Sequence, residues 1–353
     1  MKIELGIMEE LGWILLEALI KAVLIFTLIL LAAATLVYCE RKVSAFIQNR
    51  IGPNRAGPKG LLQPFADVLK LFMKEDIVPD AANKNLHRLA PIISLGITVA
   101  VYAVIPLGSS FELAGRTIQM GIAPNVNIGI LFILAMTSVG VYGITIAGWS
   151  SNNKYSLLGG LRSSAQMISY ELSMGLAIMG VIMVTGSLNL NDIIIHQSGW
   201  LWNILLQPLG FIIFLVSAFA ETNRTPFDLP EAEPELVGGY NTEYTGMKFG
   251  MFFLAEYGNM ATSSALIAIL YLGGWQLPFN PEWLGLQEGS IWMALAQFVT
   301  IVVKILLLCN FFIWVRWTVP RFRYDQLMNL GWRVLLPLAL LNVILTGIVM
   351  FLI

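Results

Sequence analysis

The feature that most constrains this chain is a series of apolar runs, each close to 20 residues long. A helix needs about 20 mainly apolar residues to cross the hydrocarbon core of a bilayer, which is roughly 30 Å thick. Only 12% of the residues are charged, whereas a soluble domain carries about 25%. These runs exclude a soluble globular protein and predict an all-α integral membrane protein.

The runs predict about eight transmembrane helices. We expect them at residues 11–38, 90–108, 128–148, 165–185, 202–220, 249–273, 291–315 and 333–353. The sequence shows no tandem repeat or flexible linker, which indicates one transmembrane domain over residues 1–353. The N-terminal residues lack the basic segment and cleavage site of a signal peptide, so we expect the first span to remain in the mature protein.

The distribution of basic residues predicts the orientation in the membrane. The net charge of −1 says nothing about partners. Seventeen of the 21 Lys and Arg residues fall in four alternate loops, and only two fall in the opposite loops and termini. The four loops are residues 39–89, 149–164, 221–248 and 316–333. Because basic loops stay on the cytoplasmic side, we expect these four loops inside and both termini outside.

The first inner loop, 39–89, is too long to be a simple connection. Two sets of residues in it recur at helical spacing: apolar Leu61, Phe65, Val68 and Phe72, and polar Gln63, Asp67, Lys70 and Lys74. This pattern predicts an amphipathic helix of about four turns that lies along the membrane surface. The preceding residues 50–58 alternate Gly and Pro with Arg, which indicates a stiff, cationic turn. The loop is either an anchor helix or the rim of a cavity for an amphiphilic ligand.

The third inner loop, 221–248, is acidic and cannot form a regular helix. Pro226, Pro230 and Pro234 recur every four residues, and proline disrupts a helix interior. The local charge is −4, against +4 for the first inner loop, so the two loops can attract each other. The acidic loop is therefore either a salt-bridge lock between loops or a proton-collecting strip of neighbouring carboxylates. We treat loops 39–89 and 221–248 as the two functional cytoplasmic loops.

Several ionisable residues fall inside the expected spans or at their inner ends. They are Glu17, Lys21, Glu40, Glu171, Glu221, Glu256 and Lys304. Glu17 and Lys21 are four residues apart on one helix face, so mutual neutralisation accounts for them. The four other glutamates lie in the cytoplasmic half, where they either hydrogen-bond helices together or relay protons. Lys304 is a candidate counter-charge for one of them.

Four inner stretches carry a resemblance to a known family. They are residues 40–76 (beginning ERKVSAF), 152–171 (NNKYSLLGGLRSSAQMISYE), 220–250 (beginning AETNRTPFDLPEAEPELVGGY) and 320–332 (PRFRYDQLMNLGW). The sequence there resembles the quinone-site membrane subunit of respiratory complex I, the NADH:quinone oxidoreductase. The likeness covers the inner loops and adjoining helix ends. The eight-span layout extends the likeness over the chain. The outer loops and span interiors share the general type of residue but no specific motif.

The resemblance implies a subunit of a proton-pumping enzyme that reduces ubiquinone or menaquinone with electrons from NADH. It implies peripheral-arm subunits that hold FMN and iron–sulfur clusters, together with small membrane subunits, antiporter-like pumping subunits and membrane lipids as partners. It implies no nucleic acid and a bacterial cytoplasmic (inner) membrane location. With two Cys and two His, this chain has too few ligands for an iron–sulfur cluster or a haem pair, and the resemblance implies that no metal or flavin is bound here.

The resemblance also assigns roles to residues. For quinone binding it implies a set in the first and third inner loops: Arg41, Arg50, Arg55, Phe65, Asp67, Lys70, Phe72 and Arg224. For the proton path we expect the carboxylates and one lysine: Glu40, Glu171, Glu221, Asp228, Glu231, Glu233, Glu235, Glu256 and Lys304. Quinone reduction beside titratable glutamates would change their protonation and drive a relay.

Two other functions remain open from the sequence. A homologous anchor subunit of a membrane-bound hydrogenase or ferredoxin-linked complex shares the fold without necessarily reducing quinone. A stand-alone ion transporter would also carry intramembrane carboxylates, but the chain lacks paired Gly/Pro-broken spans in two repeated halves.

Overall fold

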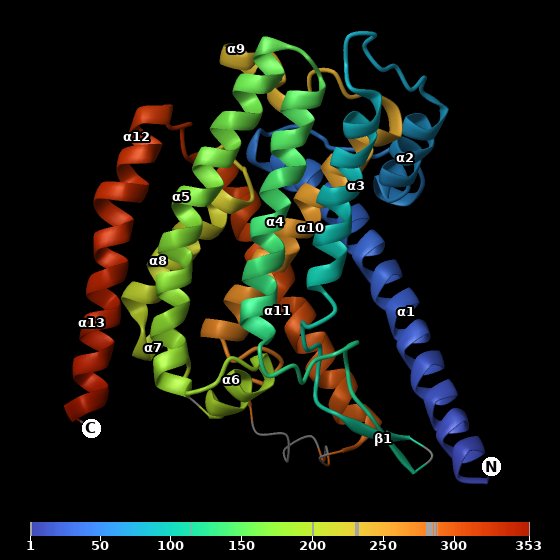
Figure 1. The fold of residues 1–353 in the computed structure, drawn as a ribbon, viewed down its shortest axis with the longest axis vertical. Coiled ribbons are helices and arrows are strands. Elements are labelled where there is room, and N and C mark those ends of the chain that lie inside the picture. The colour runs from blue at the N-terminus through green and yellow to red at the C-terminus, as the bar shows by residue number, and fades with distance from the viewer. Residues whose placement is uncertain are drawn as a thin grey trace.

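The computed structural model describes residues 2–113, 115–199, 201–229, 233–279, 285, 287 and 289–352. Over these residues the protein is a bundle of helices with one small hairpin (Figure 1). The long helices are α1 (Lys2–Ile47), α3 (Lys84–Val101), α4 (Gly129–Ser150), α5 (Lys154–Thr185), α8 (Pro208–Glu221), α10 (Gly246–Tyr271), α11 (Ile291–Thr318) and α13 (Leu336–Leu352).

Shorter elements connect these helices. They are η1 (Pro58–Gly60), α2 (Gln63–Met73), α6 (Leu190–His196), α7 (Asn203–Leu206), α9 (Glu233–Leu236), η2 (Gly239–Asn241), α12 (Tyr324–Asn329) and the π-helical turn η4 (Leu330–Leu335). Strands β1 (Phe111–Leu113) and β2 (Arg116–Ile118) form an antiparallel hairpin with Phe111 opposite Ile118.

Within the described residues, five helical segments are long and apolar enough to span a membrane by length and composition. They are Gly12–Ile47, Gly129–Ser150, Lys154–Thr185, Ile291–Thr318 and Tyr324–Leu352. The three other expected spans also form helices, α3, α8 and α10, but they are shorter or more polar. The all-α membrane class is therefore confirmed, while the number eight stays a prediction.

Two of the differences from the expected spans concern α5 and α8. Helix α5 begins at Lys154 rather than near residue 165, because Asn153 caps its N-terminus by accepting from the Tyr155 amide at 2.9 Å. Glu171 therefore lies near the middle of a long helix rather than two turns from its inner end. The expected span 202–220 is broken at Gln207 into α7 and α8, and Pro208 begins α8.

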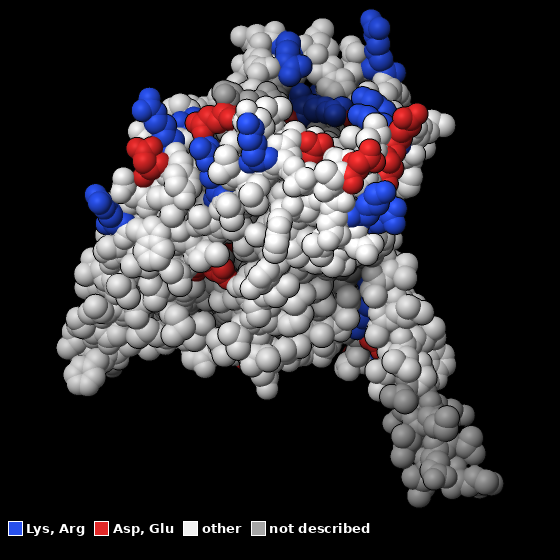
Figure 2. Space-filling view, turned by 45° about the horizontal axis from the view of Figure 1, so that its top comes forward, with Lys and Arg blue, Asp and Glu red and all other residues white. Residues whose placement is uncertain are grey.

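The two ends of the bundle have different characters. Figure 1 shows both termini at one end, with α6 and the hairpin nearby, and α2 and α9 at the opposite end. In Figure 2 the charged side chains gather mainly toward the end with α2, and the rest of that face is largely uncharged. This arrangement agrees with alternating loops and with termini that share a side.

The amphipathic helix α2 has 11 residues, so it makes three turns rather than the expected four. It packs against α1 and α10. Its apolar residues Phe65 and Phe72 stay exposed, at 51% and 65%. Helix α2 therefore presents an apolar surface that the described part of this chain does not cover.

Glycines allow the central helices to pack closely. A Cβ on Gly148 of α4 would lie 2.6 Å from the Ser156 carbonyl oxygen of α5, and one on Gly160 would lie 3.3 Å from Gly148 Cα. Small residues at such contacts let membrane helices approach each other. In the α3–α4–α5 layer formed in this way, α3 packs against α10, whose C-terminal half is buried from Met260 to Tyr271.

Candidate functional site

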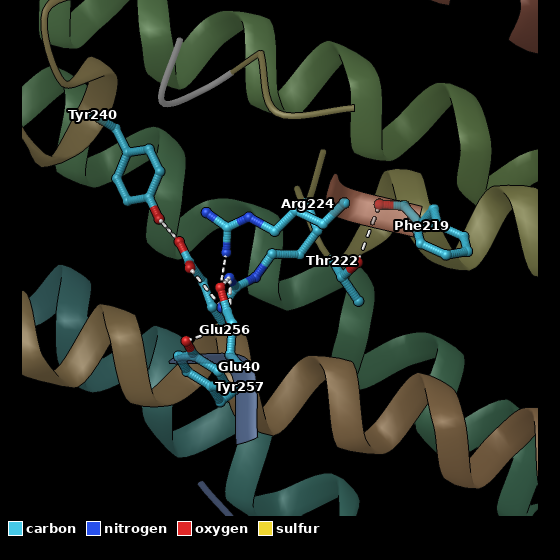
Figure 3. A network of polar contacts seen from close by, with 8 residues as sticks. Glu40, Phe219, Thr222, Arg224, Tyr240, Glu256 and Tyr257 are labelled. Atoms are coloured by element: carbon cyan, nitrogen blue, oxygen red, sulfur yellow. Dashed lines mark hydrogen bonds and ion pairs between the residues drawn. The ribbon is translucent and has the colours of Figure 1, made fainter. Parts of the chain in front are cut away.

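A buried cluster of charges lies where α1, α10, α11 and the segment after α8 meet. Its centre is Glu40 of α1, which is only 9% exposed. Arg224 Nη1 lies 3.3 Å from both oxygens of this carboxylate, and the Tyr257 hydroxyl donates to Oε2 at 2.6 Å. Arg316 Nη1 of α11 donates to Oε1. Two guanidinium groups and one phenol thus surround a single carboxylate (Figure 3).

Arg224 connects Glu40 to a second carboxylate. Its Nη2 lies 3.7 Å from Glu256 Oε2, and its guanidinium carbon lies 4.5 Å from the centre of the Tyr257 ring. The Tyr240 hydroxyl donates to Glu256 Oε1 at 3.1 Å (Figure 3). Burial lowers the pKa of Arg224, but Glu40, Tyr257 and Glu256 outweigh it and raise the pKa. Arg224 therefore stays charged between two acids.

The segment after α8 has a defined conformation that positions Arg224. Asn223 adopts φ 50°, a left-handed conformation in which Asn is favoured among non-glycine residues. The buried side chain of Gln166 on α5 donates to the carbonyls of Ala220 at 2.7 Å and Phe227 at 2.9 Å. Gln166 thus clamps both ends of the turn that carries Arg224.

A small cavity lies directly beside Glu256. It has a volume of about 40 Å³, room for roughly two or three water molecules. Helices α3, α4, α5, α8 and α10 enclose it together with Tyr240, and its polar lining includes Glu221, Glu256, Thr98, Asn259 and Thr137. Glu171 lies on α5, where it accepts a hydrogen bond from Ser138 of α4. The cavity can hold water between Glu221 and Glu256, which is what proton exchange between them requires.

The stiff turn and α2 form a second group of residues, on the other side of Glu40. Arg41 Nη1 lies 2.6 Å from Asp67 Oδ2, so α1 holds α2. Gly60 has φ 83°, and a Cβ there would lie 2.1 Å from the Pro53 carbonyl oxygen, so only glycine fits. Arg50 donates to Gln48 at 2.6 Å, while Arg55 and Lys70 are exposed and make no side-chain hydrogen bond or ion pair within the described residues. Phe65 and Phe72 extend this surface with apolar area.

The acidic loop is tied to other inner loops. Asp228 pairs with Arg321 at 3.1 Å, and Glu235 pairs with Arg162 at 2.6 Å. These two acids therefore join the acidic loop to the second and fourth inner loops. The first loop is joined differently, by Asp76 and Lys248 at 2.9 Å. Of the other predicted acids, Glu233 begins α9, and Glu231 and the Glu233 side chain lie outside the described residues.

Lys304 binds backbone carbonyls beyond the end of α10. Its Nζ donates to three backbone carbonyls that follow the end of α10, those of Leu272 at 2.8 Å, Gly274 at 2.8 Å and Gln276 at 3.1 Å. It also lies 5.0 Å from the Trp202 ring centre. A cation there satisfies carbonyls that the helix leaves free. The expectation that Lys304 is the counter-charge of a buried carboxylate stays a prediction.

Three members of the charge cluster do not emerge from the sequence. Its patterns indicate Arg316 only as an inner-loop base, and they do not single out Tyr240 or Tyr257. The available signals are the position of Arg316 at the inner end of a span and the adjacency of Tyr257 to Glu256. Neither signal identifies a partner, because the contacts join segments far apart in the sequence.

Comparison with known proteins identifies the family. A model described as NADH dehydrogenase matches residues 20–347. The chain is 55% identical over 334 residues to NADH-quinone oxidoreductase subunit 8 of Rhodothermus marinus, covering 93% of this chain and 95% of that protein. It is 54% identical over 339 residues to the corresponding NADH-quinone oxidoreductase subunit of Salinibacter ruber, covering 94% and 95%. The chain therefore belongs to the NADH dehydrogenase family, whose named members include these subunits of NADH-quinone oxidoreductases.

Proposed function

We propose that this chain is the membrane subunit of a proton-pumping NADH:quinone oxidoreductase. In this role it forms the quinone entrance and part of the tunnel wall, and it begins the proton path that couples quinone reduction to pumping. The names of the relatives, which are subunits of NADH-quinone oxidoreductases, support the first part. The closeness of the buried charge cluster to the group formed by the stiff turn and α2 supports the roles in quinone binding and proton transfer.

The observation that carries this proposal is the contact made by two consecutive residues of α1. Glu40 binds Arg224, Arg316 and Tyr257 in the buried charge cluster. Arg41 pairs with Asp67 on α2, beside the stiff turn. A cationic and apolar surface that suits an amphiphilic acceptor is thus one residue away from a set of buried acids.

The proposed quinone site is a rim formed by the end of α1, the stiff turn and α2. Arg41, Arg50, Arg55, Asp67 and Lys70 would meet the polar head or brace the tunnel, Phe65 and Phe72 would contact the apolar parts, and Arg224 would border its deep end. Reduction of quinone consumes protons and changes the charge in this region. The neighbouring carboxylates would respond because an altered charge within about 4–6 Å shifts carboxyl protonation strongly.

The proposed proton path starts from the same place. We assign to it the carboxylates of the charge cluster, the cavity and the acidic loop: Glu40, Glu171, Glu221, Asp228, Glu231, Glu233, Glu235 and Glu256. The cavity between Glu221 and Glu256 supports this path because it has room for bridging water. Lys304 is also among the residues that the sequence predicts for the path, but its carbonyl contacts favour a helix-capping role.

The proposal places the chain in a bacterial inner membrane with both termini on the periplasmic side. Peripheral-arm subunits with FMN and iron–sulfur clusters would cover the exposed surface of α2. Small membrane subunits, pumping subunits and lipids would surround the remaining apolar faces.

Photo-crosslinking tests the proposal directly. The intact oxidoreductase complex is illuminated with a photoreactive quinone analogue, with and without excess ordinary quinone, and the labelled peptides of this chain are identified. We expect quinone-protected labelling within residues 41–72. Protected labelling confined to the hairpin, α6 or α13 would overturn the assignment of the quinone site.

A further inference from the structure

Glu40 has two cationic partners in the charge cluster, although one cation is enough to neutralise its carboxylate. Arg316 and the Tyr257 hydroxyl contact this carboxylate from α11 and α10. Arg224 is the third partner, at 3.3 Å from each oxygen. If Arg224 moved away, Glu40 would keep a cation and a hydroxyl donor. It would not become an unpaired buried charge, the state that makes breaking such a pair costly.

Arg224 lies between the carboxylates of Glu40 and Glu256, and it makes no short, two-pronged ion pair with either one. Its Nη1 lies near Glu40, and its Nη2 is 3.7 Å from Glu256, too far for a direct hydrogen bond. The Nε and Nη2 atoms are buried and have no hydrogen-bond acceptor within the described residues. The side chain is only 8% exposed, so these donors are turned toward the interior of the site.

The surface beneath Arg224 allows it to move. The guanidinium lies over the face of Tyr257, with 4.5 Å from its central carbon to the ring centre. A stacked guanidinium keeps this cation–π contact when it slides in the ring plane. The Tyr257 hydroxyl also donates to Glu40, so the ring on which Arg224 lies is fixed beside that carboxylate (Figure 3).

We propose that Arg224 is a two-position switch that moves between Glu40 and Glu256 and thereby decides whether Glu256 holds a proton. With Arg224 on Glu40, the charge of Arg224 moves away from Glu256, which takes a proton from the water of the adjacent cavity. With Arg224 on Glu256, the carboxylate is ionised and its proton passes to the cavity, which Glu221 also lines. Arg316 makes the exchange possible because it holds Glu40 in both positions.

The groups that face this switch come from five segments. They are Glu40 on α1, Glu256 and Tyr257 on α10, Arg316 on α11, Tyr240 on η2 and Glu221 on α8. Arg224 is thus a positioning residue that acts through Glu256. This inference rests on the proposed function, because it assumes that Glu256 exchanges protons during turnover.

Infrared difference spectroscopy of the intact complex provides the test. The carboxylic-acid C=O band that disappears in Glu256→Gln reports the protonated form of Glu256, and its intensity is followed against pH. Arg224→Gln should make the band persist to higher pH, by about 1–3 units, because a cation near the carboxylate is lost. Glu40→Gln should have the opposite effect, since Arg224 is then released to Glu256.

Arg316 provides the decisive comparison because it donates to Glu40, the carboxylate that Arg224 also contacts. Arg316→Gln should also make the band persist to higher pH, because Arg224 is then held on Glu40. The same substitution in the Arg224→Gln background should cause no further shift. This double-mutant cycle separates an effect through Arg224 from a direct charge effect. If Arg316→Gln lowers the yield of complex, Arg316→Lys should give a smaller shift of the same sign.

The outcomes separate the switch from the proposed function. An unshifted band in Arg316→Gln, or an equal shift with and without Arg224, would overturn the switch while leaving Glu256 as a proton carrier. A Glu256→Gln complex with full quinone-linked pumping would instead remove Glu256 from the proton path. Arg116→Gln serves as the matched control, because Arg116 lies on the hairpin over Trp13, away from the cluster.

Discussion

Arg41 of α1 and Asp67 of α2 form an ion pair with 2.6 Å between Nη1 and Oδ2. Both side chains are partly exposed, at 43% and 31%, so the pair itself stabilises by no more than about 1 kcal/mol. Its importance lies in geometry, because it joins the amphipathic helix to the residue that follows Glu40. The pair therefore sets the position of the proposed quinone rim rather than the stability of the fold.

Asp67→Asn should raise the KM for quinone by about fivefold, the factor that corresponds to roughly 1 kcal/mol. The kcat should change less, because the charge cluster around Glu40 is intact. The measurement is quinone-linked NADH oxidation by membranes with equal amounts of complex. The exchanged double variant Arg41→Asp with Asp67→Arg restores the pair and should recover most of the loss. No recovery would mean that each side chain contacts quinone individually.

Glu256→Gln should reduce quinone-linked electron transfer and proton pumping by roughly 10²-fold, the usual contribution of a positioned proton-transfer group. The amide keeps the shape and can still accept from Tyr240, but it cannot exchange a proton. NADH oxidation with an artificial acceptor should remain unchanged, because that reaction does not use the membrane site. Glu17→Gln is the matched control, since Glu17 pairs with Lys21 in the outer part of α1.

Gly60→Ala should disrupt the stiff turn before α2. The φ of 83° disfavours any Cβ, and the new atom would lie 2.1 Å from the Pro53 carbonyl oxygen, so the turn must open. We expect destabilisation by more than about 3 kcal/mol locally, with loss of quinone reduction. Gly115→Ala is the matched control: it has φ 76° but open space around its Cβ. Equal losses of assembled complex in the two variants would show that backbone strain, and not the clash, is responsible.

The local features of this fold follow from the sequence. The eight expected spans correspond to helices because apolar runs determine where helices form in a membrane. The Glu17–Lys21 pair, four residues apart, forms as expected with 2.6 Å between Nζ and Oε1. The amphipathic helix lies where its periodicity predicts it, although one turn shorter. Each of these features depends on residues close together in the chain.

The candidate site was only partly predictable because its contacts are long-range. Arg224 and Glu40 are 184 positions apart, and Arg316 and Glu40 are 276 apart. Residue type indicates that a buried arginine needs an acid, but it does not say which acid. The acidic loop shows the same problem, since residue types do not indicate that Glu235 pairs with Arg162 and Asp228 with Arg321. Only tertiary packing decides such choices.

Lys304 shows that the charge of a residue inside a span does not by itself identify its partners. Its three acceptors are backbone carbonyls, which leave no trace in the residue types of a sequence. Lys304→Met should leave these carbonyls without a donor, and a buried polar group without its partner costs about 1–3 kcal/mol. We therefore expect a lower melting temperature and less assembled complex, both measured by native gels and thermal denaturation of the purified enzyme.

The number of protons that Lys304 variants pump per NADH decides whether this lysine belongs to the proton path. Lys304→Arg keeps a cation and several donors, so it should assemble better than Lys304→Met. If Lys304 only caps the carbonyls after α10, both variants should pump the same number of protons per NADH as the unaltered complex. A reduced ratio in intact, normally reducing complex would return Lys304 to the path. That ratio is insensitive to the amount of enzyme, so it separates the loss of a cap from the loss of a proton carrier.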